Sequence, residues 1–329
     1  MPSSSSAHRP LLVWAGADQI PWLSSALERA GLTPARAGGP GLTPHQITEL
    51  GAEPIADLSM ALRSVSHADV LLLNRPAEGT LEWLESRAAA AELRKKNVVV
   101  TSLDPLPTSA LSPLLVEDDD PYRAVYPRRS PIGVAFFDAM TTFGAAQTVL
   151  YAARGVASQG GLGALLVGAL DTLSHLQGEP EAIDAAISTP RAASGVRAAP
   201  ADDLSLLRGS LTAHLRFESG ASAVIALADS CGRSFRGVTV TGDAGLIRFS
   251  NEGFEWTDTA GALVDRTDAP GDPVAVLADQ IIATATGPAP AEPPSAARTL
   301  ALAGAAVLSA RTGQPESPVT IRRMAGMVV

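Results

Sequence analysis

Residues 11–21 read Leu11-Leu12-Val13-Trp14-Ala15-Gly16-Ala17-Asp18-Gln19-Ile20-Pro21. The first four form a short apolar run that is typical of a buried first β-strand. Beyond the turn, Ser24–Ala30 predicts a helix. The side chains spaced to line one face of this helix are Trp22, Leu23, Ala26, Leu27 and Ala30. A strand, a short turn and a helix in this order are how a dinucleotide-binding domain begins.

The turn between this strand and helix departs from the pattern of such a domain. A dinucleotide-binding turn is rich in glycine, so that the backbone can approach the pyrophosphate and the helix can pack close to the strand. Here Gly16 is the single glycine, between Ala15 and Ala17, and Asp18 brings a negative charge to the place where phosphate would sit. Ala15, Gly16 and Ala17 therefore occupy the positions of a cofactor-binding turn but lack its usual glycine pattern.

Composition limits the class of protein. A chain of 329 residues suggests about two domains, and no apolar run approaches the roughly 20 residues that cross a membrane. The segment 1–10 is polar and Ser-rich, without the apolar core of a signal peptide, so we expect a cytoplasmic protein. A single cysteine, Cys231, excludes a disulfide framework and a cysteine-based zinc cluster, and we predict no metal site. The net charge of −9 argues against a nucleic-acid partner.

The first 125 residues alternate strand and helix signals. Strands are expected at 32–37, 70–73 and 97–100, and helices at 58–65, capped by Asp57, and at 82–94. Continuous apolar strands that alternate with helices indicate a parallel, doubly wound sheet. We therefore predict an N-terminal Rossmann-like domain over residues 1–125.

The pattern changes after Tyr126, and residues 126–329 are predicted to form a second domain. Residues 211–217 alternate apolar and polar side chains, with Thr212, His214 and Arg216 outward. Further strands are expected at 223–228, 238–240 and 246–249, and closing helices at 274–286 and 295–311. This order indicates an α+β domain with a large, mostly antiparallel open sheet.

Several segments, in this order and spacing, resemble the Gfo/Idh/MocA family of sugar and polyol oxidoreductases over nearly the whole chain. They are 68–73 with Arg75-Pro76, 97–105, 163–180, 211–249 and 310–313. The resemblance implies a two-domain fold, NAD(P), hydride transfer at a sugar carbon, and a lysine and a histidine in the active site. Arg75 and Pro76 lie where the family has a Thr-Pro step, so they are further candidate cofactor-binding positions.

The catalytic residues that the resemblance implies do not carry over. The family's Glu-Lys-Pro triplet falls on Leu103-Asp104-Pro105, which puts Asp104 in place of the lysine. Its histidine position is Gly168, and Asp171 alone matches the second motif. General acid–base groups contribute about 10²–10⁴-fold each, so loss of both should remove most hydride transfer.

Three sets of residues are candidates for other chemistry. Asp104 is either a loop residue that caps the next turn or a carboxylate at the active-site mouth, acting as a base or binding a cation or hydroxyl. Asp171 and His175 lie four residues apart, as a relocated acid–base pair or as a helix-stabilising pair with a packed histidine. Arg128 and Arg129 either hold a substrate carboxylate or hydroxyl, or form a solvated edge.

Two hypotheses follow. The first is a non-catalytic or accessory homologue of sugar dehydrogenases, with no cofactor, that assembles as a homo- or hetero-oligomer through the second sheet. The second is an enzyme, either an NAD(P)-dependent sugar or polyol oxidoreductase or a cofactor-free lyase or isomerase that uses Asp171 and His175. A sugar-like small molecule is a possible ligand in both, and the sequence does not name a substrate.

Overall fold

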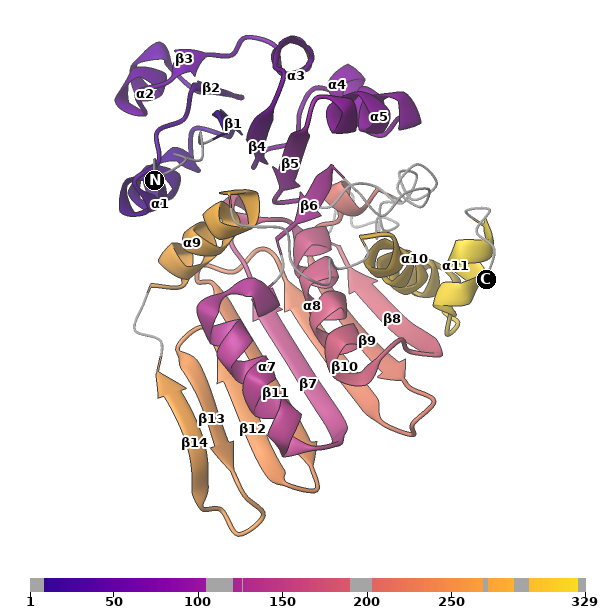
Figure 1. The fold of residues 1–329 in the computed structure, drawn as a ribbon. Helices are drawn as coiled ribbons and strands as arrows, with labels where there is room; N and C mark the ends of the chain where they lie inside the picture. The colour runs from indigo at the N-terminus through magenta and orange to yellow at the C-terminus, as the bar shows by residue number, and fades with distance from the viewer. Residues whose placement is uncertain are drawn as a thin grey trace, which may run out of the picture.

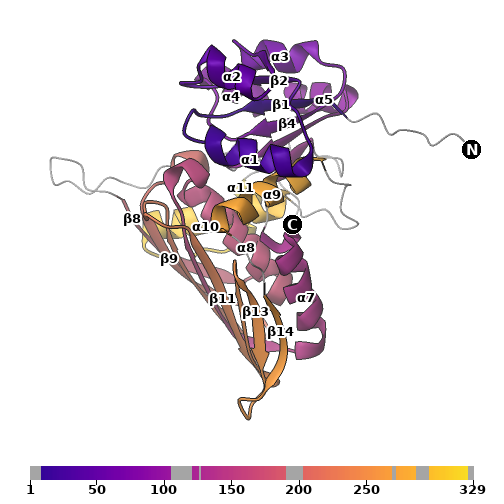
Figure 2. The same ribbon diagram turned by 90° about the vertical axis from the view of Figure 1, so that its left-hand side faces the viewer.

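The structure is a computed structural model that describes residues 9–104, 121–125, 127–189, 203–268, 272–286 and 296–324. An α/β domain at the N-terminus lies against one end of a second domain, which is built on a long sheet (Figures 1 and 2). No helix in the described part of the chain is long and apolar enough to cross a membrane.

The first sheet has six parallel strands in the order β3-β2-β1-β4-β5-β6. Its central strands are short apolar runs, and every residue of β4 is buried, as expected of a sheet that helices cover on both faces. The second expected strand begins later than predicted, at Arg36, and includes Gly38. The strands are β1 (Leu11–Trp14), β2 (Arg36–Gly38), β3 (Glu53–Pro54), β4 (Ala68–Leu72), β5 (Val98–Ser102) and β6 (Tyr122–Ala124).

In the described residues five helices lie between these strands, and two of them differ from the prediction. Helix α1 begins at Ile20, four residues early, and its last residue Ala30 is exposed. The single helix expected at 82–94 is two helices, because Ser86 caps a new one by accepting the Ala89 N–H. The cap at Asp57 is confirmed. The helices are α1 (Ile20–Ala30), α2 (Pro44–Glu49), α3 (Leu58–Ser64), α4 (Glu78–Leu84) and α5 (Arg87–Lys95).

The second sheet has eight strands in the order β14-β13-β12-β11-β7-β10-β9-β8. All neighbouring strands are antiparallel except β7 and β10. The predicted fold class, a Rossmann-like domain followed by a mostly antiparallel open sheet, is confirmed. The strands are β7 (Ala146–Arg154), β8 (Ala182–Ser188), β9 (Ser210–Arg216), β10 (Ser222–Ala228), β11 (Phe235–Gly242), β12 (Gly245–Ser250), β13 (Gly253–Thr257) and β14 (Leu263–Asp268).

The two faces of the second sheet have different environments. Helices α7 (Pro131–Phe143), α8 (Leu162–Gln177) and α10 (Ala296–Thr312) lie on one face, and none of the helices that the structure describes lies on the other (Figure 2). On β9 the residues Leu211, Ala213 and Leu215 are buried and the predicted outward residues are exposed. The uncovered face also exposes Leu150 and Val224, by 50% and 39%. A short helix, α11 (Pro318–Met324), ends the described chain.

Helix α9 (Pro273–Thr286) returns from the second sheet to the first domain. Its buried Ala278, Ile281 and Ile282 share a core with β1 and α1, and its Asp279 forms a 2.7 Å ion pair with Arg29 of α1. The periodicity of this helix does not show which domain it packs on. The domain boundary near residue 125 remains a prediction, to which the structure adds this return segment.

Candidate functional site

The loops that follow β1, β4 and β5 meet the second domain at one edge of the first sheet. In open parallel sheets, ligands bind outside the carboxyl ends of the strands. A cavity at this edge is lined by residues that include Arg75, Pro76, Ser102, Asp104 and Ser205. The structure therefore brings together three of the residues singled out in the sequence: Arg75, Pro76 and Asp104.

The turn after β1 is filled by a side chain of its own. Gln19 is 3% exposed, and its Oε1 accepts the Gly16 N–H at 2.7 Å. Its Nε2 donates to the Leu73 carbonyl at 2.8 Å and to the Ser158 carbonyl at 3.0 Å. Ser158 belongs to the second domain, so Gln19 links the turn, the end of β4 and the loop after β7. The Gly16 N–H is therefore already hydrogen-bonded within the protein.

The start of helix α1 offers little else to an anion. A helix N-terminus binds phosphate through its free N–H groups, but Pro21 in the first turn has none. The carboxylate of Asp18 lies beside Gly16, with Oδ1 only 2.7 Å from the place where a Cβ on Gly16 would be. The negative charge and the occupied donor both oppose binding of a pyrophosphate here.

The loop after β2 also lies against this turn. Gly39 has a φ of +140°, and a Cβ there would be 2.0 Å from the carbonyl oxygen of Ala15. Ala15 is fully buried beneath it, and its N–H donates to Gly38. In a dinucleotide-binding domain, an acidic side chain about 20 residues after the glycines holds the ribose. Here glycine backbone occupies the equivalent edge.

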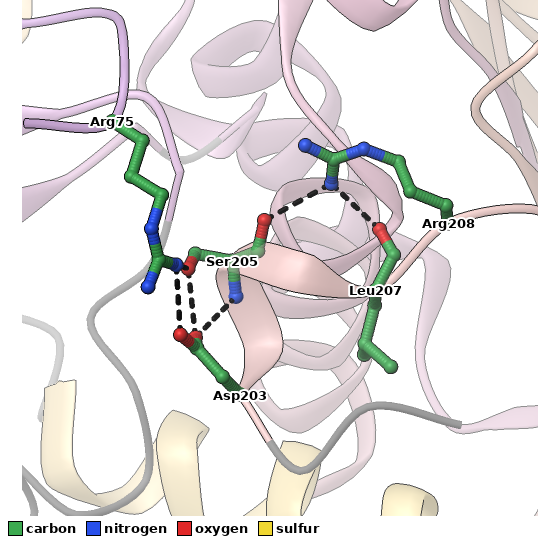
Figure 3. Close-up of polar contacts among 5 residues, drawn as sticks. All are labelled: Arg75, Asp203, Ser205, Leu207 and Arg208. Carbon is green, nitrogen blue, oxygen red and sulfur yellow. Dashed lines mark hydrogen bonds and ion pairs between the residues drawn. The ribbon is translucent and has the colours of Figure 1, made fainter. Parts of the chain in front are cut away.

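A polar cluster joins the two domains at the cavity (Figure 3). Arg75, just after β4, donates to Asp203 at 2.7 Å and also contacts the Ser205 hydroxyl. Arg208 donates to the backbone carbonyls of Ser205 and Leu207 at 3.0 and 2.7 Å. The contacts of Arg75 hold the 3₁₀ helix η4 (Leu204–Leu206) against the end of β4. Arg75 thus acts as a domain link.

Asp104 faces the N-terminus of α8. Its Oδ1 accepts the N–H of Gly161 at 2.9 Å, and Gly161 is the residue that precedes this helix. Burial raises the pKa of the Asp104 carboxyl above its usual value, and the Gly161 N–H, Arg208 and Arg75 offset this only in part. This geometry agrees with the interpretation of Asp104 as a capping residue across the domain boundary.

Asp203 experiences the opposite balance. Burial alone would raise the pKa of its carboxyl, but hydrogen bonds from Arg75 and Ser205 outweigh that effect and hold the pKa below its usual value. The pKa values of these two carboxyl groups near the same cavity are therefore shifted in opposite directions from 3.8, upward for Asp104 and downward for Asp203. The cause is twofold: Asp104 is more deeply buried and accepts one backbone N–H, whereas Asp203 is less buried and accepts hydrogen bonds from Arg75 and Ser205.

We expect Asp104→Asn and Asp203→Asn to alter stability with opposite dependence on pH. The pKa of Asp104 is raised in the folded protein, so ionisation of this carboxyl lowers the free energy of unfolding as the pH rises from 3.8 to that raised pKa. Over this range Asp104→Asn should therefore become more stable relative to the wild type. With a lowered pKa, Asp203 contributes stability that is lost as the pH falls from 3.8 through its folded value. Asp203→Asn should therefore become less stable relative to the wild type as the pH rises through that range. Urea unfolding at a series of pH values measures both, and parallel curves would contradict the assignment.

The second group of candidates lies farther along α8. Asp171 is 5% exposed and accepts a hydrogen bond from Arg128 Nε at 2.7 Å. Ten residues separate it from Gly161, or about 15 Å along the helix. The Asp171–Arg128 pair is therefore distinct from the cavity at Arg75 and Asp104. The side chain of Arg129 lies outside the described part of the chain.

His175 and Gly168 complete the picture of α8. His175 is exposed in the last turn, where its ring packs edge-to-face on Phe137 at 4.8 Å. A Cβ at Gly168 would lie 3.3 Å from Pro127 Cδ, a tight contact that would require Pro127 to shift by a few tenths of an ångström. These contacts favour structural roles for both residues. Within the described residues, no three or more His, Cys, Asp and Glu side chains are grouped to hold a metal ion.

Sequence reasoning missed several residues of this site. Gln19 was recognised only as part of the turn, and Asp203, Ser205 and Arg208 were not singled out. The spacing of Asp203 and Ser205 is a local signal, since the Asp203 side chain accepts the Ser205 N–H at 2.9 Å. Nothing in the sequence indicates that Arg75, 128 residues away, completes this group.

Comparisons with known proteins support the fold. No protein-family model matches the chain, and no curated protein sequence matches it. Solved structures match nearly all of it. An oxidoreductase from Agrobacterium radiobacter in complex with NAD+, L-tartaric acid and magnesium is 15% identical with a TM-score of 0.67, covering 96% of this chain and 100% of that one.

Two further dehydrogenases match with similar scores. Myo-inositol 2-dehydrogenase from Lactobacillus plantarum is 13% identical with a TM-score of 0.63, covering 94% of this chain and 99% of that one. UDP-N-acetylglucosamine 3-dehydrogenase GnnA from Acidithiobacillus ferrooxidans is 15% identical with a TM-score of 0.63, covering 93% and 98%. Identities this low establish a shared fold, so the resemblance to Gfo/Idh/MocA-type oxidoreductases is confirmed at the level of the fold.

Proposed function

We propose that this chain is a non-catalytic homologue of the sugar and polyol dehydrogenases, which keeps their two-domain fold without binding a dinucleotide. The observation that carries the proposal is the closed turn after β1. Gln19 takes the Gly16 N–H at 2.7 Å, and its amide is anchored on Leu73 and Ser158. A pyrophosphate would have to displace this buried side chain and approach the Asp18 carboxylate.

The residues at the chemical positions support the same proposal. Asp104 stands in place of an amine and already accepts the Gly161 N–H. Gly168, in place of the histidine, is packed against Pro127. Gly168 has no side chain that could transfer a proton, and the Asp104 carboxyl is already held by the Gly161 N–H, so hydride transfer would lack the lysine and histidine that the family uses as acid–base groups.

The alternative is an active NAD(P)-dependent sugar or polyol oxidoreductase. Its support is the fold shared with the Agrobacterium radiobacter oxidoreductase, which was solved with NAD+. A cofactor-free reaction at Asp171 and His175 has less support, because Asp171 pairs with Arg128 and His175 packs on Phe137. A sugar-like ligand in the cavity beside Arg75 remains open under either proposal.

Titration with NADH and NADPH, followed by nicotinamide fluorescence and by thermal shift, tests the proposal. We expect no saturable signal at millimolar concentrations of either nucleotide. Submillimolar binding would overturn the proposal in favour of the oxidoreductase. A gain of thermal stability with one nucleotide, dependent on its concentration, would do the same, because a ligand that binds the native state stabilises it.

We also propose that the uncovered face of the second sheet is where this chain assembles, as a homo- or hetero-oligomer. The support is the apolar character of its centre, where Leu150 on β7 and Val224 on β10 are 50% and 39% exposed beside the small side chains of Ala152 and Ala226. Contiguous exposed apolar surface of this kind is typical of interaction sites.

We expect the purified chain to form an oligomer that Val224→Glu dissociates, because a carboxylate in an apolar interface loses its hydration. Light scattering at micromolar concentration measures the change. Met60→Glu is the matched control, since Met60 is 70% exposed on α3 of the other domain, and it should leave the mass unchanged. A wild-type monomer, or equal masses for Val224→Glu and the wild type, would contradict self-assembly through this face.

A further inference from the structure

A second cavity lies at the end of the second sheet nearest α9, where β7 ends and β11 begins (Figure 1). Its volume is about 300 Å³, at the lower end of the range of small-molecule sites. Arg154 of β7 pairs with Phe235 of β11 across the ladder, and the turn between β12 and β13 forms the other wall. A neighbouring hollow continues from it to Val276 and Leu277 of α9.

Three arginines line this cavity: Arg154, Arg233 and Arg236. Glu252 is the single carboxylate among the lining residues, which leaves a local charge of +2 in a chain whose net charge is −9. Within the described part of the chain, none of the three arginines forms an ion pair. Three like charges with a single nearby carboxylate repel each other, and a bound anion relieves that repulsion.

Arg236 is the most constrained of the three. Its guanidinium hydrogen-bonds the buried hydroxyl of Tyr151, while its Nε is buried without a hydrogen-bond partner among the residues that the structure describes. A buried N–H of a charged group that lacks an acceptor is costly. Arg154 and Arg233 are exposed, so their guanidinium groups are free to close on a ligand that enters from solvent.

We infer that this cavity binds the phosphate group of a small phosphate monoester. Guanidinium groups donate paired hydrogen bonds to phosphate oxygens, and Ser250 and Asn251 add a hydroxyl and an amide donor to the same walls. The Ser234 hydroxyl, also in the lining, already donates to Gln159. Phe235, which is 47% exposed, provides an apolar surface for the organic part of the ester. This site is separate from the turn at Gly16, so it does not depend on whether a dinucleotide binds.

Isothermal titration of the full chain with glucose 6-phosphate, inorganic phosphate and glucose tests the inference. We expect saturable binding of glucose 6-phosphate that weakens with added salt, weaker binding of inorganic phosphate, and none of glucose. Arg233→Gln and Arg154→Gln should each weaken binding by about 10- to 100-fold, the value of a charge-assisted hydrogen bond. Arg216→Gln is the matched control, because Arg216 is exposed at the far end of β9, and it should bind as the wild type does.

Two results would overturn the inference: no saturable binding of glucose 6-phosphate at millimolar concentration, or binding by Arg233→Gln and Arg154→Gln as tight as that of the wild type. Equal affinity for inorganic phosphate would contradict the assignment to an ester. Arg233 and Arg154 are exposed side chains, so both variants should fold as stably as the wild type. Nicotinamide binding in a separate titration would bear on the proposed function and leave this site untouched.

Discussion

Replacing Gln19 with alanine is expected to lower the free energy of unfolding by about 2–4 kcal/mol. The side chain is 3% exposed and makes hydrogen bonds to Gly16, Leu73 and Ser158. Alanine removes all of them and leaves a buried N–H and two carbonyls without their partner. Because Ser158 belongs to the second domain, the change should loosen the contact between the domains as well. Urea unfolding, followed by tryptophan fluorescence, measures the loss.

Gln147→Ala is the matched control for this experiment. Gln147 is exposed on β7 and makes a side-chain hydrogen bond to Asp243, so its replacement should change stability by no more than about 0.5 kcal/mol. If Gln19→Ala were as stable as Gln147→Ala, Gln19 would not be the structural closure of the turn. The proposal that this side chain blocks dinucleotide binding would then lose its support.

Replacing Asp171 with alanine is expected to cost about 3–5 kcal/mol of stability. The carboxylate is 5% exposed and pairs with Arg128 at 2.7 Å, and the Arg128 side chain is 16% exposed. Removing one partner strands the other charge in a poorly hydrated place, which is more costly than the pair itself is stabilising. Thermal and urea unfolding of the variant report the loss.

A double variant separates this structural role from a chemical one. Asp171→Leu with Arg128→Met removes both charges and keeps similar volume, so it should recover much of the stability that Asp171→Ala loses. Asp184→Ala, at an exposed position on β8, is the control and should be nearly neutral. A loss below about 1 kcal/mol for Asp171→Ala would contradict a structural ion pair at this place.

The sheets were predictable because their signals are local. The apolar runs at β1, β4 and β5 and the alternation along β9 come from the burial of one or both faces of a strand. The break at Ser86 was missed because residues 82–94 keep apolar spacing through it. Only the cap on the Ala89 N–H reveals two helices. Helix α9 shows the same limit, since its apolar face does not indicate which sheet it covers.

The candidate site was predictable in part for a topological reason. Arg75 and Asp104 follow adjacent parallel strands, so both lie at the carboxyl edge of the sheet and line one cavity. Their partners come from the second domain, Asp203 for Arg75 and Gly161 for Asp104. Contacts across 128 and 57 residues depend on how the domains meet, and no local pattern encodes that.

The same limit explains the turn after β1. The sequence showed a missing glycine pattern and an added Asp18, which predict poor phosphate binding. It did not show that a neighbouring glutamine replaces the ligand's hydrogen bond, because Gln19 needs the Leu73 and Ser158 carbonyls to be held in place. The structure thus shows that the turn is closed by a specific hydrogen bond, which can be tested at the Gly16 amide.

The backbone amide of Gly16 tests that claim most directly. In ¹⁵N-labelled protein, its NMR resonance should show slow hydrogen exchange, since the N–H donates to Gln19 inside the turn at 2.7 Å. We expect millimolar NADH or NADPH to leave both the chemical shift and the exchange rate of the Gly16 amide unchanged. A saturable movement of this resonance with either nucleotide would show that the turn opens for a dinucleotide, and would contradict the account.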